Sequence, residues 1–154
     1  MSEEYLKSYL IKNNVSFKIH EFKEHTMTVE AAEKQLGVER SKIIKSMLFT
    51  DDLGNPILAI VTGDRKVDEE KLAKAIGVKK VWKAKLRMVK EITGYEAGAL
   101  PPVGHKKPIK TIIDPKVLEN NVVFGGGGRV NKLLEIDPKD IVKLTNAEVV
   151  RIST

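Results

Sequence analysis

The sequence predicts a single α+β domain built on a mixed, partly barrel-like β-sheet that is flanked by short helices. The chain has 154 residues, of which 42% are apolar, so it can bury a hydrophobic core without disulfide bonds. Short strand patterns and short helix patterns are mixed along it, without the regular alternation of a parallel α/β fold. No internal repeat, low-complexity segment or linker divides the sequence. We therefore expect one domain over residues 1–154.

Five segments carry helix signals. The expected helices are residues 3–13, which Ser2 could cap, residues 28–36, 69–76 and 86–93, and a segment that begins at Pro138. Thr28 and Asp68 are typical N-cap residues. Gly37 and Gly77 stand where helices commonly end. Asp137 precedes a proline at the first helical position, which is a common way for a helix to begin.

The strand signals are short runs of apolar and β-branched residues. They predict strands at residues 17–22, 41–49, 56–62, 81–82, 111–114, 122–124, 132–136 and 147–152. Turn residues at 51–55 join two of these runs into a hairpin. Residues 94–108 contain three glycines and three prolines, which exclude a helix or a central strand. Ordered loops of this length in a compact domain tend to be functional.

Lys45 is the anomaly of the strand at residues 41–49, because its neighbours are apolar. Lysine ammonium groups are almost never fully buried without a partner. One side of Lys45 should therefore be open, either to solvent or to an anionic ligand. From this strand alone, two interpretations stand: a lysine that extends its methylenes along the sheet and keeps its charge in water, or a lysine that faces a binding site.

Composition excludes several classes of protein. The absence of cysteine excludes disulfides, a cysteine nucleophile and thiolate metal sites. The histidines, His20, His25 and His105, lack metal-ligand spacing, so we expect neither a metal nor another cofactor. No apolar run approaches the roughly 20 residues that span a bilayer, and the first residues do not form a signal peptide. We expect a cytoplasmic protein without a membrane partner. The net charge of +6 favours a polyanion such as nucleic acid.

The loop from Gly98 to Gly104 combines glycines with paired prolines. Glycines allow a ligand to approach backbone amides closely, and the prolines fix the shape of the loop. Such a loop could present N–H groups to a carbonyl or a developing oxyanion, or it could be a rigid surface turn. His105 stands directly beside it and is the best placed of the histidines for a role in a site.

A second glycine run covers residues 125–128 and ends at Arg129. Successive glycine amides can form an anion-binding nest, and the arginine could contact a phosphate or a carboxylate. The run lacks both the Walker ending and the G-x-G-x-x-G context, so a flexible turn between strands is the alternative. Asp64 and Asp114, at strand ends, could orient a ligand amine or hydroxyl, or could cap turns. Trp82 could stack on a base, although packing in the core is the simpler interpretation.

In their order along the chain, these elements resemble the YbaK family, which includes the editing insertion of bacterial prolyl-tRNA synthetases and free-standing aminoacyl-tRNA deacylases. The matching residues are Thr28-Val29-Glu30-Ala31-Ala32, Leu36-Gly37-Val38, Ile43-Ile44-Lys45-Ser46, Val61-Thr62-Gly63-Asp64, Val67-Asp68, Lys71-Leu72-Ala73, Gly98 to Gly104 and Gly125 to Gly128. The resemblance extends from about residue 28 to residue 141.

The resemblance implies hydrolysis of the ester that joins a wrong amino acid to the 3′ end of a tRNA. It assigns Lys45 to the tRNA end and Gly98 through Pro102 to the aminoacyl pocket, and it implies that a ribose hydroxyl of the substrate helps to activate water. Such a mechanism needs neither a protein nucleophile nor a metal. Some members have a histidine after the last glycine run, where this chain has Arg129-Val130-Asn131, so the role of that histidine is not carried over.

We therefore expect a free-standing deacylase for a small amino acid, alanine or cysteine, on proline tRNA. Lys45 is the expected catalytic residue. The expected substrate-binding residues are Gly98, Ala99, Leu100, Pro101, Pro102, Gly104, His105, Asp64, Asp114, Gly126, Gly127 and Arg129. The expected partners are the aminoacyl end of tRNA and, secondarily, an aminoacyl-tRNA synthetase. The alternative function is a non-catalytic RNA-binding module or adaptor with the same fold.

Overall fold

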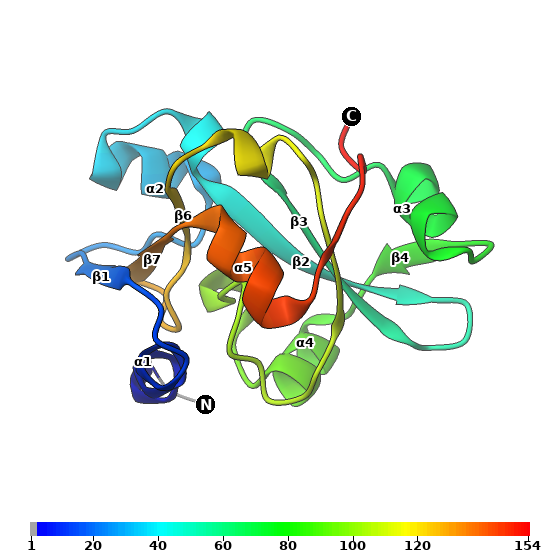
Figure 1. Cartoon of the computed structure of the whole chain (residues 1–154), viewed down its shortest axis with the longest axis horizontal. Coiled ribbons are helices and arrows are strands. Elements are labelled where there is room, and N and C mark those ends of the chain that lie inside the picture. Colours follow the sequence, from blue (N-terminus) through cyan, green and yellow to red (C-terminus); the bar gives the residue numbers. More distant parts are fainter. Residues whose placement is uncertain (1–2) are drawn as a thin grey trace.

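The structure is a computed structural model that describes residues 3–154; Ser2, the expected helix cap, lies outside them. Within these residues, five α-helices surround two β-sheets (Figure 1), which confirms the predicted α+β class. The helices are α1 (Glu3–Lys12), α2 (Val29–Leu36), α3 (Glu69–Ile76), α4 (Leu86–Thr93) and α5 (Pro138–Thr145). The strands are β1 (Phe17–Glu21), β2 (Ile44–Asp51), β3 (Pro56–Thr62), β4 (Val81–Lys83), β5 (Lys110–Ile113), β6 (Val123–Gly126), β7 (Lys132–Ile136) and β8 (Glu148–Val149).

The larger sheet has the strand order β4-β2-β3-β5-β8. Strands β2 and β3 form the expected antiparallel hairpin, in which Lys45 pairs with Val61. Strand β5 adds to β3, and β8 to β5, both in parallel, so the sheet is mixed as predicted. On the other side of β2, β4 pairs only with Phe49–Asp51. The first half of β2, which carries Lys45, therefore lies beyond the reach of β4.

The smaller sheet is antiparallel, with the order β1-β7-β6. A parallel bridge between Ile43 and Phe124 connects it to the start of β2. Figure 1 shows α2, β1, β6 and β7 gathered at one end of the long β2–β3 hairpin, and α3 and β4 at the other end. Strand β6 extends through Gly125 and Gly126, so half of the glycine run is strand rather than turn.

The predicted helix ends are confirmed by their geometry. The Thr28 hydroxyl accepts a hydrogen bond from the Ala31 amide at 3.1 Å, and the Asp68 carboxylate accepts bonds from two amides of α3. Gly37 and Gly77 take the left-handed conformation, with φ of 70° and 73°. Local sequence signals therefore fix where these helices begin and end.

The last strand is shorter than the sequence predicts, because a side chain replaces part of the sheet. Strand β8 pairs with β5 only at Glu148–Val149. The Ile152 and Ser153 amides donate instead to the Asp114 carboxylate, each at 2.9 Å. The carboxylate thereby satisfies backbone groups that a longer strand would pair.

Apolar side chains cover both faces of the larger sheet. On one face, Leu48 and Ile60 belong to a core cluster that includes residues of α1, β6 and β7. On the other face, Phe49 and Val61 pack with Leu72 of α3. Among the described residues, no helix is both long enough and apolar enough to cross a membrane.

Candidate functional site

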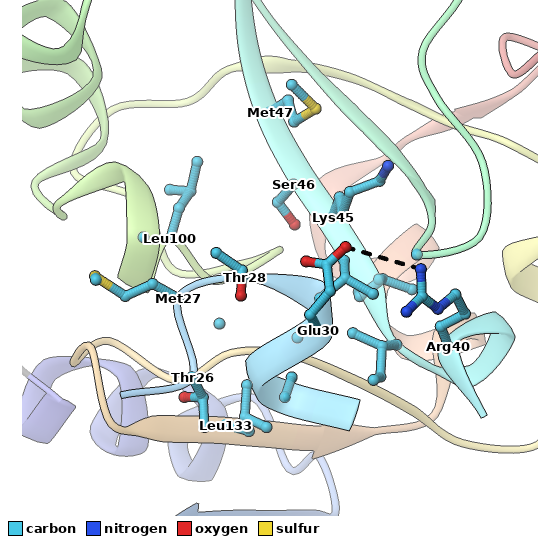
Figure 2. A pocket seen from close by; sticks show the side chains of 18 of the residues that line it. Thr26, Met27, Thr28, Glu30, Arg40, Lys45, Ser46, Met47, Leu100 and Leu133 are labelled. Atoms are coloured by element: carbon cyan, nitrogen blue, oxygen red, sulfur yellow. Dashed lines mark ion pairs between the residues drawn. The ribbon is translucent and has the colours of Figure 1, made fainter. Parts of the chain in front are cut away.

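A cavity of about 530 Å³ opens at the first half of β2 (Figure 2). Helix α2 and the segment before it form one wall, the loop after β3 forms another, and residues 97–100 with β6 close the remainder. Five of the residues singled out in the sequence line this cavity: Lys45, Asp64, Gly98, Leu100 and Gly126. They come from four separate stretches of the chain, which the fold brings together.

Lys45 is half-buried at this cavity. Its ammonium donates a hydrogen bond to the Arg65 carbonyl, and no carboxylate of residues 3–154 forms an ion pair with it within 4.0 Å. Burial, and then repulsion from Lys66 and Lys83, lowers the pKa of Lys45. A lysine in such surroundings gains when an anion arrives, because the anion offsets both the lost hydration and the repulsion.

Other cations stand beside Lys45. Arg65 and Lys66, in the loop after β3, line the same cavity. Arg40 lines it too, but its guanidinium is held by Glu33 at 2.8 Å and lies 3.8 Å from Glu30. The Lys45 side of the cavity is therefore suited to a phosphate or another anion.

The opposite side of the cavity is apolar and closely fitted. Met27 packs so tightly on Gly98 that a Cβ added there would lie 2.9 Å from the Met27 Cγ. Leu100 and Leu133 also line this side. This side of the cavity therefore offers an apolar surface.

The glycine run has a packing role that the sequence interpretation missed. A Cβ added at Gly126 would lie 2.2 Å from the Leu100 carbonyl oxygen, so glycine lets β6 approach the 97–100 segment. The Gly127 amide donates to the Lys132 carbonyl and the Gly128 amide to the Ala99 carbonyl, both at 3.0 Å. These two amides are therefore already engaged within the fold and do not form an open anion-binding nest.

Several predicted site residues do not line the cavity. They are Ala99, Pro101, Pro102, Gly104, His105, Asp114, Gly127 and Arg129. Arg129 lies 4.0 Å from the Glu3 carboxylate, with its side chain 58% exposed. Burial alone would raise the pKa of Asp114, but hydrogen bonds from the Lys116, Ile152 and Ser153 amides outweigh it and lower that pKa. Asp114 thus acts as a cap that fixes the C-terminal segment.

His105 lies behind the loop rather than in the cavity. Its Nε2 is 2.7 Å from the Pro101 carbonyl oxygen, which ties the two ends of the proline-containing turn together. Burial lowers the pKa of His105, although this hydrogen bond acts in the opposite direction. Among the other histidines, His20 lies 2.9 Å from the Glu135 carboxylate, and neither His20 nor His25 lines the cavity.

His105 should make the protein less stable in mild acid. Because its pKa is lower in the folded state, the unfolded chain takes up a proton first as the pH falls below about 6.5. The contribution is complete above that pH and is lost toward the lower folded-state value, with a slope of at most about 1.4 kcal/mol per pH unit. Urea unfolding between pH 7.5 and 5.5 measures it, with His105→Gln as the control. Equal pH slopes in both proteins would contradict this assignment.

The cavity also contains residues that the sequence did not single out as site residues. Thr28 was predicted as a helix cap and Ser46 as part of the Lys45 strand, and both belong to runs that carry the family resemblance, but neither was given a role in the site. Met27, Glu30 and Arg40 had no predicted role in a site, yet all five residues line the cavity. The available signal was that Thr28, Glu30 and Ser46 belong to the runs 28–32 and 43–46 that carry the family resemblance.

Trp82 corrects a prediction, because it lies outside the core. Its side chain is 45% exposed, and the Lys80 ammonium lies 5.9 Å from its ring centroid. Trp82 lines a second cavity of about 410 Å³, together with Lys83 and residues of α4. Strand β4 is an edge strand, so it has a neighbouring strand along only one of its two edges.

Comparisons with known proteins identify relatives whose descriptions concern the aminoacylation and editing of tRNA. The sequence model of the aminoacyl-tRNA editing domain matches residues 23–144. A relative from Enterococcus faecalis, named "Putative Cys-tRNA(Pro)/Cys-tRNA(Cys) deacylase EbsC", is 30% identical over 145 residues, which are 93% of this chain and 88% of the relative. A proline–tRNA ligase of Maridesulfovibrio salexigens is 43% identical over 79 residues, which are 51% of this chain but only 13% of the ligase.

Solved structures share the whole fold. One is described as "Crystal structure of a putative trans-editing enzyme for prolyl tRNA synthetase". It matches with a TM-score of 0.89 at 28% identity and covers 99% of this chain and 96% of its own. The fold described above therefore occurs in a chain of similar length.

Proposed function

Because the chain belongs to the aminoacyl-tRNA editing domain family, we propose that it is a free-standing hydrolase that removes a wrongly attached small amino acid from tRNA. The observation that carries this proposal is the division of one cavity into a cationic side at Lys45 and a confined apolar side at Gly98 and Leu100. A tRNA end presents the same two features next to each other, a phosphate-linked nucleotide and a small side chain.

Proline tRNA bearing alanine or cysteine is the proposed substrate. The relative from Enterococcus faecalis carries Cys-tRNA(Pro) in its name, and proline–tRNA ligases contain a matching segment. The apolar side of the cavity at Gly98 and Leu100 is consistent with a small side chain, because an editing site acts on groups that are small enough to enter it.

In the proposed reaction, water attacks the ester carbonyl, a tetrahedral oxyanion forms, and the ribose oxygen leaves as a hydroxyl. Lys45 holds the terminal nucleotide through its phosphate and fixes the ester in the cavity. Residues 98–102 shape the pocket for the aminoacyl group, with Gly98 and Leu100 at the cavity wall. Asp64 and Gly126 complete the wall. The attacking water is activated by a ribose hydroxyl of the substrate, which needs no protein nucleophile.

The test is release of radiolabelled amino acid from proline tRNA charged with alanine, cysteine, serine or proline. We expect release of alanine or cysteine and retention of proline. Binding of uncharged tRNA, measured over a range of salt concentrations, accompanies the assay. Salt-sensitive binding without release from any charged species would replace the hydrolase with a non-catalytic tRNA-binding adaptor.

A further inference from the structure

The hydroxyl of Ser46 is buried in the cavity wall without a protein partner. Its Oγ is a buried side-chain oxygen that has no hydrogen-bond partner among residues 3–154. The residue lines the cavity. Ser46 pairs with Ile60 on β3, and alternation along β2 places it on the face of the core residues Ile44 and Leu48. A polar atom is costly there unless a ligand satisfies it.

The oxygens near Ser46 indicate what kind of ligand group it meets. Figure 2 shows the oxygens of Glu30 and Ser46 at the space between α2 and β2, with Thr28 beside them. The Thr28 hydroxyl also accepts a hydrogen bond from the Ala31 amide, and the Glu30 carboxylate lies 3.8 Å from Arg40. The Lys45 ammonium is directed away from this space, toward the loop after β3. Two hydroxyls and a carboxylate offer hydrogen-bond acceptors and negative charge. They suit a positively charged donor rather than a phosphate or an ester oxygen.

We propose that Ser46, with Thr28 and Glu30, binds the α-ammonium group of the aminoacyl moiety. This assignment rests on the proposed deacylase function and adds a second anchor to it. Lys45 holds the nucleotide on one side of the ester, and the Ser46 Oγ accepts a hydrogen bond from the ammonium on the other side. The ester carbonyl is thereby fixed between two anchors, so Ser46 acts by positioning the substrate.

Ser46→Ala tests the assignment when two esters on the same tRNA are compared. One is the alanyl ester, and the other is the propionyl ester, in which hydrogen replaces the amino group. We expect the variant to lower kcat/KM for the alanyl ester about tenfold, as for one hydrogen bond to a charged group. Activity on the propionyl ester and affinity for uncharged tRNA should stay unchanged. Equal losses on both esters, or no loss on either, would overturn the assignment.

Thermal unfolding is a second measurement, and it distinguishes a structural role of Ser46 from a role in binding. Ser46→Ala removes an unpartnered hydroxyl, so its melting temperature should equal or exceed that of the wild-type protein. The matched control is Thr111→Val, because the Thr111 hydroxyl is buried, donates to the Ile109 carbonyl at 2.9 Å and does not line the cavity. The control should lower the melting temperature and leave kcat/KM unchanged. A marked loss of stability in Ser46→Ala would make the hydroxyl structural and overturn the assignment.

The wild-type protein separates a failure of this assignment from a failure of the proposed function. No release from any mischarged tRNA would overturn the deacylase and, with it, the ammonium subsite. Wild-type hydrolysis of the alanyl ester, together with a fully active Ser46→Ala variant, would overturn only the subsite.

Discussion

Replacing Lys45 with alanine should reduce deacylation of mischarged tRNA by about 100-fold or more, which is the scale for losing a charged group that positions or stabilises a reacting substrate. Lys45 is half-buried at the cavity, and its ammonium donates a hydrogen bond to the Arg65 carbonyl. Alanine leaves the terminal phosphate without this cation. The initial rate of amino-acid release from charged tRNA measures the effect.

The same substitution should cost little stability. Burial and the repulsion of Lys66 and Lys83 lower the pKa of Lys45, which means that the folded protein disfavours the charged form. Removing the ammonium relieves this repulsion and offsets the lost hydrogen bond. We expect a change within about 1 kcal/mol, or a few degrees in melting temperature.

The matched control is Lys18→Ala, which removes an exposed lysine from β1 in the smaller sheet. It lowers the net charge by the same amount and should leave the rate of deacylation nearly unchanged. Similar losses of deacylation rate in both variants would mean that Lys45 acts only through the overall positive charge of the protein. A Lys45→Ala protein that melts many degrees lower would instead identify Lys45 as a structural residue.

The fold was predictable because its signals are local. Thr28, Asp68, Gly37 and Gly77 begin and end helices through contacts within a few residues, so their effect can be recognised in a short window of sequence. The environment of Lys45 was predictable for a related reason. An apolar, β-branched run predicts an interior strand, and a charge within such a run requires an opening beside it.

The full cavity was not predictable, because its walls depend on long-range packing. Met27 and Gly98 are far apart in sequence, yet their close contact shapes the apolar side. Ser46 became informative only when the structure showed that its hydroxyl has no partner. Asp114 was predicted as a site residue, but the structure shows that it is a cap. Its carboxylate accepts hydrogen bonds from three backbone amides, and its position in the sequence does not reveal them.

Trp82 shows a further limit of sequence patterns. An apolar side chain on a strand is usually buried, but its burial depends on which residues pack against that face of the sheet. Strand β4 is the outermost strand of its sheet, where fewer neighbouring residues are available to cover a side chain, and neither this position nor the packing around it is contained in the local pattern. The ring is therefore left partly exposed.

Gly126→Ala should destabilise the protein by about 3 kcal/mol or more and disturb the cavity at the same time. The added Cβ would lie 2.2 Å from the Leu100 carbonyl oxygen and 2.9 Å from the Ala99 carbonyl carbon. Both atoms are backbone, so the 97–100 segment must move away from β6. Because Gly98 and Leu100 line the cavity, this movement should also reduce deacylation. Urea unfolding and the deacylation rate measure the two effects.

Gly125→Ala is the matched control, because it adds the same methyl group one residue earlier in the same strand. Its Cβ would meet the Ile44 side chain at 3.0 and 3.1 Å, and a side chain can adjust where a backbone carbonyl cannot. We expect Gly125→Ala to lose clearly less stability than Gly126→Ala. If both variants lost the same amount of stability, a general cost of replacing glycine in β6 would explain the result. The close approach of the 97–100 segment would then not be the reason for glycine at position 126.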